Sequence, residues 1–138
     1  MFRHVVTVLT VVAVAACAAR PVPVPHNVSF GQLRHMPPPP VGSPGSSPRI
    51  VAAWFSGARV RRGRTWSGRI VTSTNVASVE VRSNLFSIDV PRQTFGRFAF
   101  DLHVFDVPPI FVRGYRLRLI ARNAAGAAVE EDVPFRIQ

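Results

Sequence analysis

The sequence predicts an all-β domain of two packed layers, and three observations lead to this prediction. From Arg49 to Gln138 apolar and polar residues alternate with period two, and β-branched and aromatic residues dominate. Glycine, proline and asparagine interrupt the pattern at short intervals, as turns between strands do. No stretch carries a sustained apolar face at helical spacing.

Seven strands are expected in residues 49–138. They cover residues 50–56, 65–72, 76–82, 85–90, 97–105, 115–122 and 128–137. The alternation is clearest where Phe98, Phe100 and Leu102 flank polar or small residues, which predicts one buried and one exposed face. The chain has a single cysteine, at position 17, so no disulfide supports this domain.

One segment of twelve residues is the most specific. It reads Tyr-Arg-Leu-Arg-Leu-Ile-Ala-Arg-Asn-Ala-Ala-Gly from Tyr115 to Gly126. Its spacing resembles strand F and the following turn of fibronectin type III and related immunoglobulin-like domains. The resemblance implies a single seven-stranded immunoglobulin-like β-sandwich, in which Tyr115 forms the tyrosine corner. Leu117 takes the buried position that a cysteine holds in antibody domains, and Asn123 and Gly126 belong to the turn.

The last two expected strands form a hairpin with a testable register. If the chain turns about Ala125, Arg118 lies opposite Asp132 and Arg122 lies near Ala128. Opposite charges facing each other across two strands stabilise a sheet. The arginines of this strand are therefore interpreted as sheet surface rather than as a binding site.

Residues 1–16 have the layout of an export signal. A basic head at Arg3 and His4 precedes an apolar stretch that is too short to span a membrane. The stretch ends in Val14-Ala15-Ala16-Cys17, which resembles the lipobox of bacterial lipoproteins. The resemblance implies cleavage after Ala16 and attachment of a diacylglyceryl group to Cys17.

An ordinary secretory signal, cut after Ala15 or Ala18, is the alternative. The two interpretations place the domain either on the outer face of a bacterial membrane or free outside the cell. For a bacterium with two membranes, the non-acidic Ala18 implies the outer membrane as the destination of a lipoprotein.

Residues 17–48 are predicted to be a disordered, proline-rich linker between the lipid-attachment cysteine and the domain at 49–138. Nine of the 13 prolines fall between residues 18 and 48. Such chains extend and act as spacers. Four apolar residues interrupt the segment: Val28, Phe30, Leu33 and Met36. They form either a piece that docks on a partner or on the domain, or simply a less polar stretch of loop.

All 17 basic residues are arginine, and residues 49–138 carry 14 of them against seven acidic residues. A surface of this charge associates with polyanions. For an exported protein, the partners considered are an envelope protein, an anionic envelope polymer and the membrane that holds a lipid on Cys17. No motif for specific nucleic-acid recognition is present, and nothing in the sequence selects an oligomeric state.

Four arginines fall close together between Gly57 and Thr65, at Arg59, Arg61, Arg62 and Arg64. A loop flanked by glycine can turn backbone amides and guanidinium groups toward one anion. This stretch is the candidate site for an anion or a partner. The alternative is a solvated turn in an arginine-rich protein.

A second cluster, formed by Asp101, His103 and Asp106, is the only one that suggests chemistry. A metal site needs three or four converging ligands, and no further histidine or cysteine supports this cluster. No catalytic residue, metal ligand or cofactor is therefore assigned. The sequence predicts a non-enzymatic binding or structural module, with a small envelope hydrolase as the least favoured alternative.

Overall fold

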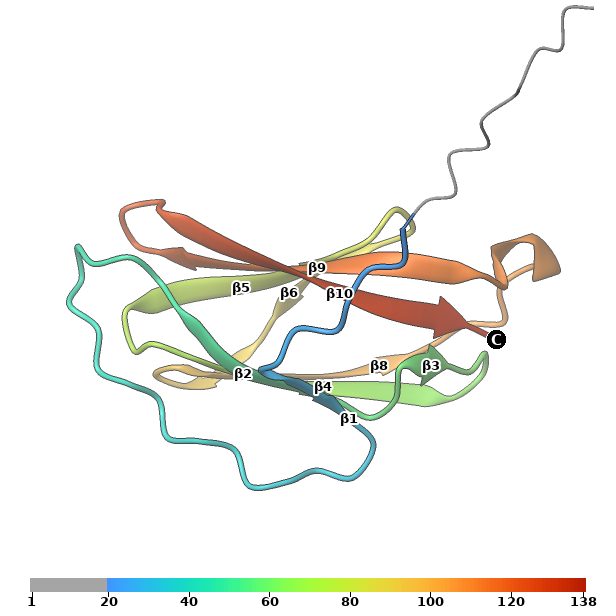
Figure 1. The fold of residues 1–138 in the computed structure, drawn as a ribbon, viewed down its shortest axis with the longest axis horizontal. Coiled ribbons are helices and arrows are strands. Elements are labelled where there is room, and N and C mark those ends of the chain that lie inside the picture. The colour runs from blue at the N-terminus through green and yellow to red at the C-terminus, as the bar shows by residue number, and fades with distance from the viewer. Residues whose placement is uncertain (1–19) are drawn as a thin grey trace, which may run out of the picture.

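A computed structural model describes residues 20–138, which form two five-stranded sheets packed face to face (Figure 1). Sheet A has the order β1 (Val28–Phe30), β2 (Ile50–Phe55), β4 (Thr65–Thr72), β8 (Arg97–His103) and β7 (Arg92–Thr94). Sheet B has the order β3 (Arg59–Val60), β10 (Ala128–Ile137), β9 (Gly114–Asn123), β5 (Val76–Arg82) and β6 (Ser87–Val90). A short 3-10 helix, η1 (Pro109–Phe111), precedes β9.

The two-layer all-β prediction is confirmed, and each of the seven expected ranges contains a strand. The structure has three more strands, β1, β3 and β7, each of two or three residues. The count of seven strands is therefore too low. A strand this short shows no alternation, so its pairing depends on neighbours that are distant in sequence.

The core lies between the sheets and is built by the predicted alternation. Tyr115, Leu117, Leu119 and Ala121 of β9 point inward and are at most 9% exposed. Trp66 of β4 lies among aromatic rings, stacked on Phe55 and Phe135 with centroid distances of 5.3 and 5.9 Å. Its indole Nε1 donates a hydrogen bond to the carbonyl oxygen of Gly57. Large aromatic side chains from both sheets thus pack together in the core.

The hairpin of β9 and β10 has the predicted register. Asp132 pairs with Arg118 and Ala128 with Arg122, and Arg118 Nε lies 3.0 Å from Asp132 Oδ1. Asn123 is buried, and its Oδ1 accepts a hydrogen bond from the amide of Ala127. Gly126 has a φ of 89°, a left-handed conformation that favours glycine. The turn sequence therefore fixes the register of the hairpin.

Residues 20–48 differ from the extended tether expected from their composition. β1 pairs in parallel with β2, and Val28 is buried. The indole Nε1 of Trp54 donates a hydrogen bond to Gly31 O. The ring of Phe30 lies 6.1 Å from that of Phe55, which is fully buried. Of the interpretations considered for Val28 to Met36, the structure thus has a strand docked on the domain.

Residues 28–30 dock as an edge strand because Val28 and Phe30, at alternate positions, both pack against the core. High proline content lowers the number of backbone donors, but it does not prevent contact with the sandwich. The signal at 1–16, its cleavage residue Ala16 and the proposed lipid-attachment residue Cys17 lie outside the described residues. Within residues 20–138, no helix is long and apolar enough to cross a membrane.

Candidate functional site

The arginine stretch lies at one end of the sandwich, where β3 leads into β4 (Figure 1). Val60 is buried in the core, which anchors β3, while Arg59 beside it is exposed. The chain then makes a tight turn, in which the amide of Arg64 donates to the carbonyl oxygen of Arg61. Gly63, with a φ of 71°, supplies the left-handed residue of that turn.

Backbone hydrogen bonds to two other segments hold this turn in place. The amide of Gly63 donates to Val104 O at 2.7 Å, and the amide of Val104 donates to Arg64 O at 2.9 Å. The amide of Arg62 donates to Gln138 O. The expectation that these backbone amides face an anion is therefore wrong, because carbonyl oxygens already occupy them. The guanidinium groups remain as the anion-binding groups.

The four arginine side chains differ in their surroundings. Arg62 Nη1 donates to Val107 O at 3.0 Å and lies 3.5 Å from Asp106 Oδ1. Arg59, Arg61 and Arg64 are exposed and form no ion pair with a carboxylate of the described residues. Arg62 thus ties the turn to the segment after β8, and the other three present their charge to solvent.

The fold brings two more exposed arginines to this end, and sequence reasoning missed both. Arg136 of β10 pairs in register with Arg59 and with Gly114. Arg113 precedes β9, with its guanidinium carbon 5.1 Å from the centroid of the Tyr115 ring. We call this end the arginine pole, defined by Arg59, Arg61, Arg62, Arg64, Arg113 and Arg136. Asp106 is the one acidic residue in the loops that carry it, 57–64 and 104–113.

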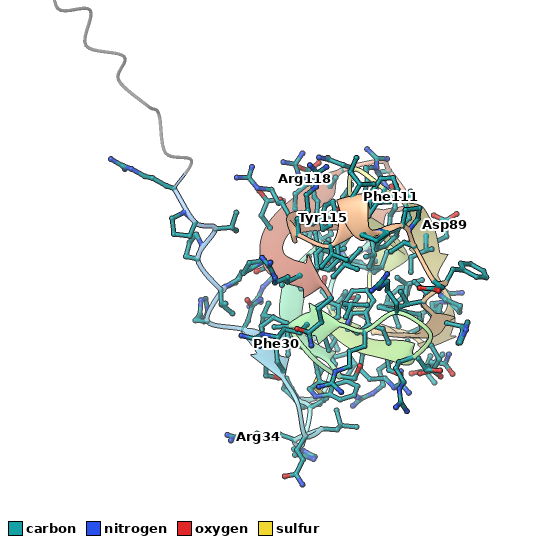
Figure 2. All side chains as sticks on the ribbon, turned by 90° about the vertical axis from the view of Figure 1, so that its right-hand side faces the viewer. Phe30, Arg34, Asp89, Phe111, Tyr115 and Arg118 are labelled. Atoms are coloured by element: carbon teal, nitrogen blue, oxygen red, sulfur yellow. The ribbon has the colours of Figure 1, made fainter. Side chains whose placement is uncertain are left out.

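Tyr115 holds the segment before β9 against the core at this pole. Its hydroxyl donates a hydrogen bond to Phe111 O at 2.9 Å, and Figure 2 shows the two residues close together where the right-hand end of Figure 1 faces the viewer. The ring is 9% exposed and stacks on Phe135 at 5.4 Å. The loop that carries η1 and Arg113 is therefore fixed by a buried side chain.

Elsewhere on the surface, most strand arginines are neutralised by nearby carboxylates. Arg116 and Arg118 pair with Asp132, and Arg69 pairs with Asp101. Arg82 and Arg122 share Glu80, which sits on the outer face of sheet B. Hydrogen bonds from Ser87 and Arg122 lower the pKa of Glu80 to about 2, with smaller contributions from a hydrogen bond with Arg82 and from the positive charge of Arg82. These contacts explain the arginines involved as sheet surface. At the arginine pole, by contrast, a single acidic residue, Asp106, lies in the loops that carry the arginines.

Asp101, His103 and Asp106 do not form one site. A hydrogen bond from Ser67 and the charge of Arg69 lower the pKa of Asp101. The His103 ring meets Phe105 edge-on at 6.1 Å, and Asp106 pairs with Arg62. Each residue has a separate partner. Residues 20–138 contain no group of three or more histidine, cysteine, aspartate or glutamate side chains able to hold a metal ion.

A hollow of about 720 Å³ lies beside the outer face of sheet A. Leu33 and Met36 of the β1–β2 connection form one side of it, and Val71 and Ala99 lie among its lining residues. Two of its polar groups, Arg69 and Asp101, already pair with each other. Asp89, Gln93 and Arg97 are its other polar lining residues.

No family model matches this chain, and a search of curated proteins found no relative.

Proposed function

We propose that the chain is an exported lipoprotein whose domain is a non-enzymatic binding module. Its lipid would be attached at Cys17, as the lipobox-like Val14-Ala15-Ala16-Cys17 implies. The observation that carries the binding role is the arginine pole. There, Arg59, Arg61 and Arg64 project from a turn that backbone hydrogen bonds fix on both sides. Exposed guanidinium groups that have no carboxylate partner among the described residues suit the capture of anionic groups.

We further propose that the domain is immunoglobulin-like. The hydrogen bond from the Tyr115 hydroxyl to Phe111 O, four residues upstream, has the form of a tyrosine corner. Leu117 lies two residues later and is fully buried, at the position expected for the core of such a domain. Two sheets face each other across the core, as in these sandwiches, and both are antiparallel apart from the edge pairings of β1 with β2 and of β3 with β10. Trp66 departs from that pattern, because it lies on β4 rather than on the strand that carries the sandwich tryptophan in antibody domains.

A freely secreted form of the same module is the alternative. It shares the fold and the arginine pole and differs in whether Cys17 carries acyl chains. An envelope hydrolase has less support, because Asp101, His103 and Asp106 each have a separate partner.

Binding of a soluble polyanion tests the role of the arginine pole. We expect the protein to bind inorganic polyphosphate with an affinity that falls steeply as salt increases. Replacing Arg61 and Arg64 together with glutamine removes two of the positive charges. The negative slope of log K against log salt is therefore expected to become shallower by about 1.5. Fluorescence anisotropy of labelled polyphosphate over a salt series measures this slope.

The matched control replaces Arg92 and Arg97 with glutamine, at the opposite end of β8 and its partner strand β7. This variant loses the same charge and is expected to change the slope less. Equal losses in the two variants would show that only net charge matters and would remove the arginine pole as a site.

A further inference from the structure

We infer that the arginine pole docks on the surface of a bilayer that contains anionic phospholipids. This inference deepens the proposed function and rests on it for the export of the chain. The partner of the arginine pole is inferred to be a membrane because the pole has two features that a binding site for a soluble polyanion does not need. One is a pair of exposed apolar side chains, and the other is the point from which the chain reaches the domain.

The apolar side chains lie on the loop between β8 and β9. Phe105 is 76% exposed and Ile110 is 77% exposed. This loop is the one joined to the arginine turn, through the hydrogen bonds between Val104 and the turn and through the contact of Arg62 with Val107. Large apolar side chains beside several arginines are the composition of a surface that lies in a membrane interface.

The N-terminal end of the described chain lies near this pole, over the outer face of sheet B, where Arg20 and Val22 line a hollow with Arg116 and Asp132. Arg20, Pro21 and Val22 line one hollow together with Arg113, Tyr115 and Asn84. In Figure 1 the described chain accordingly starts beside the turn between β5 and β6, on the side of the molecule that carries η1.

Cys17 precedes Arg20 by three residues. Three residues span at most about 11 Å in any conformation. A lipid on Cys17 would therefore be attached within about 11 Å of Arg20, on the side of the sandwich that carries Arg113.

The docking of β1 shortens the connection between Cys17 and the sandwich. The sequence alone suggested a spacer of 31 residues between the cysteine and the domain. Because Val28 is buried and β1 is paired, the connection between Cys17 and the sandwich is confined to residues 17–27. The domain is thereby held next to the membrane, where the five exposed arginines of the pole and two apolar side chains are available to the headgroups.

Vesicle binding by the full chain with Cys17→Ala tests this inference without the contribution of a lipid. We expect this chain to sediment with vesicles of equimolar phosphatidylglycerol and phosphatidylcholine and to remain in solution with phosphatidylcholine alone. Replacing both Arg61 and Arg64 with glutamine is expected to weaken vesicle binding about twenty-five-fold, since each arginine near an anionic surface contributes about five-fold. Replacing Phe105 and Ile110 with serine is expected to weaken it as well, and by a factor that added salt leaves unchanged.

The opposite end of the sandwich offers a matched control. Phe95 there is 69% exposed, with the guanidinium carbon of Arg92 4.9 Å from its ring centroid. The variant with Arg92→Gln, Arg97→Gln and Phe95→Ser removes the same kinds of side chain and is expected to keep most of the vesicle binding. If this control loses as much binding as the pole variants, the orientation is wrong.

A fluorescent reporter separates insertion from simple charge attraction. Both natural tryptophans are buried, so Phe105→Trp adds an exposed indole at the pole. We expect its emission to shift to shorter wavelength when anionic vesicles are added, whereas Phe95→Trp is expected to show no shift. An unshifted Phe105→Trp in bound protein would overturn the inference.

A further outcome distinguishes the inference from the function on which it rests. Binding to polyphosphate without binding to either vesicle would remove the membrane as the partner and leave anion binding by the arginine pole intact. Acylation of Cys17 does not enter this assay, so a failure of lipid attachment is detected separately.

Discussion

Replacing Trp66 with alanine is expected to lower the free energy of unfolding by about 3–5 kcal/mol. The indole is 3% exposed and contacts aromatic rings of both sheets, with Phe55 and Phe100 on one side of the core and Phe135 on the other. Its removal leaves a cavity among rigid rings that cannot collapse to fill it. The loss is a large part of the ~5–15 kcal/mol that stabilises a typical domain. Chemical denaturation followed by circular dichroism measures it.

Trp66→Phe is the control for this prediction. It keeps an aromatic ring in the core and loses the hydrogen bond from Nε1 to Gly57 O, so a cost of about 1–2 kcal/mol is expected. If the alanine and phenylalanine variants were equally stable, Trp66 would not be the centre of the core.

Acid is expected to weaken the fold through Glu80. This carboxylate is buried on the outer face of sheet B and accepts hydrogen bonds from Ser87 at 2.6 Å, Arg82 at 2.8 Å and Arg122 at 3.0 Å. These contacts lower its pKa from 4.5 to about 2. The folded state therefore binds the proton less readily than the unfolded state. The stabilisation is complete above pH 4.5 and is lost as the pH falls toward 2.

The shift corresponds to no more than about 3 kcal/mol. Glu80→Gln should lower stability at pH 7 and flatten the fall in stability between pH 5 and pH 2. The control is Glu130→Gln, because Glu130 is half-exposed and lies 3.6 Å from Arg118. A surface pair of this kind contributes about 0–1 kcal/mol. Denaturation curves over this pH range test the difference. A Glu80→Gln variant with the same acid sensitivity as the wild type would contradict the assignment.

The strands that sequence reasoning found are those long enough to show alternation. β9 was recognisable because Tyr115, Leu117 and Leu119 alternate with arginines. The register of the final hairpin followed from a short turn, since a local loop fixes which residues face each other. In these elements the side chains of the strand itself carry the information.

The parts that were missed depend on contacts distant in sequence. β1 is paired because Val28 and Phe30 reach β2 across a connection of 19 residues, 31–49. The arginine pole was found only in part for the same reason. Arg136 joins Arg59 through the pairing of β10 with β3, and Arg113 is brought there by the loop after η1. The occupied amides of the turn could not be foreseen, because their acceptors include Val104 and Gln138.

The arginine pole and the outer face of sheet B differ in how their arginines are paired. At the arginine pole, Arg61 and Arg64 are exposed on a turn that is hydrogen-bonded to Val104, the residue before the exposed Phe105. On the outer face of sheet B, arginines and carboxylates neutralise each other. A lipid on Cys17 would select which end meets the membrane. The proposed orientation of the arginine pole and of the docked β1 toward the membrane therefore depends first on whether Cys17 carries a lipid.

The most direct test of this account is the intact mass and membrane fractionation of the wild type beside Cys17→Ala, both expressed in a bacterial host. The account predicts wild-type protein in the membrane fraction that begins at Cys17 and carries acyl mass, and a variant that lacks this mass. Wild-type protein that is soluble, cut after Ala15 or Ala18, and unaffected by the substitution would contradict it. The domain would then be a diffusible basic binding module.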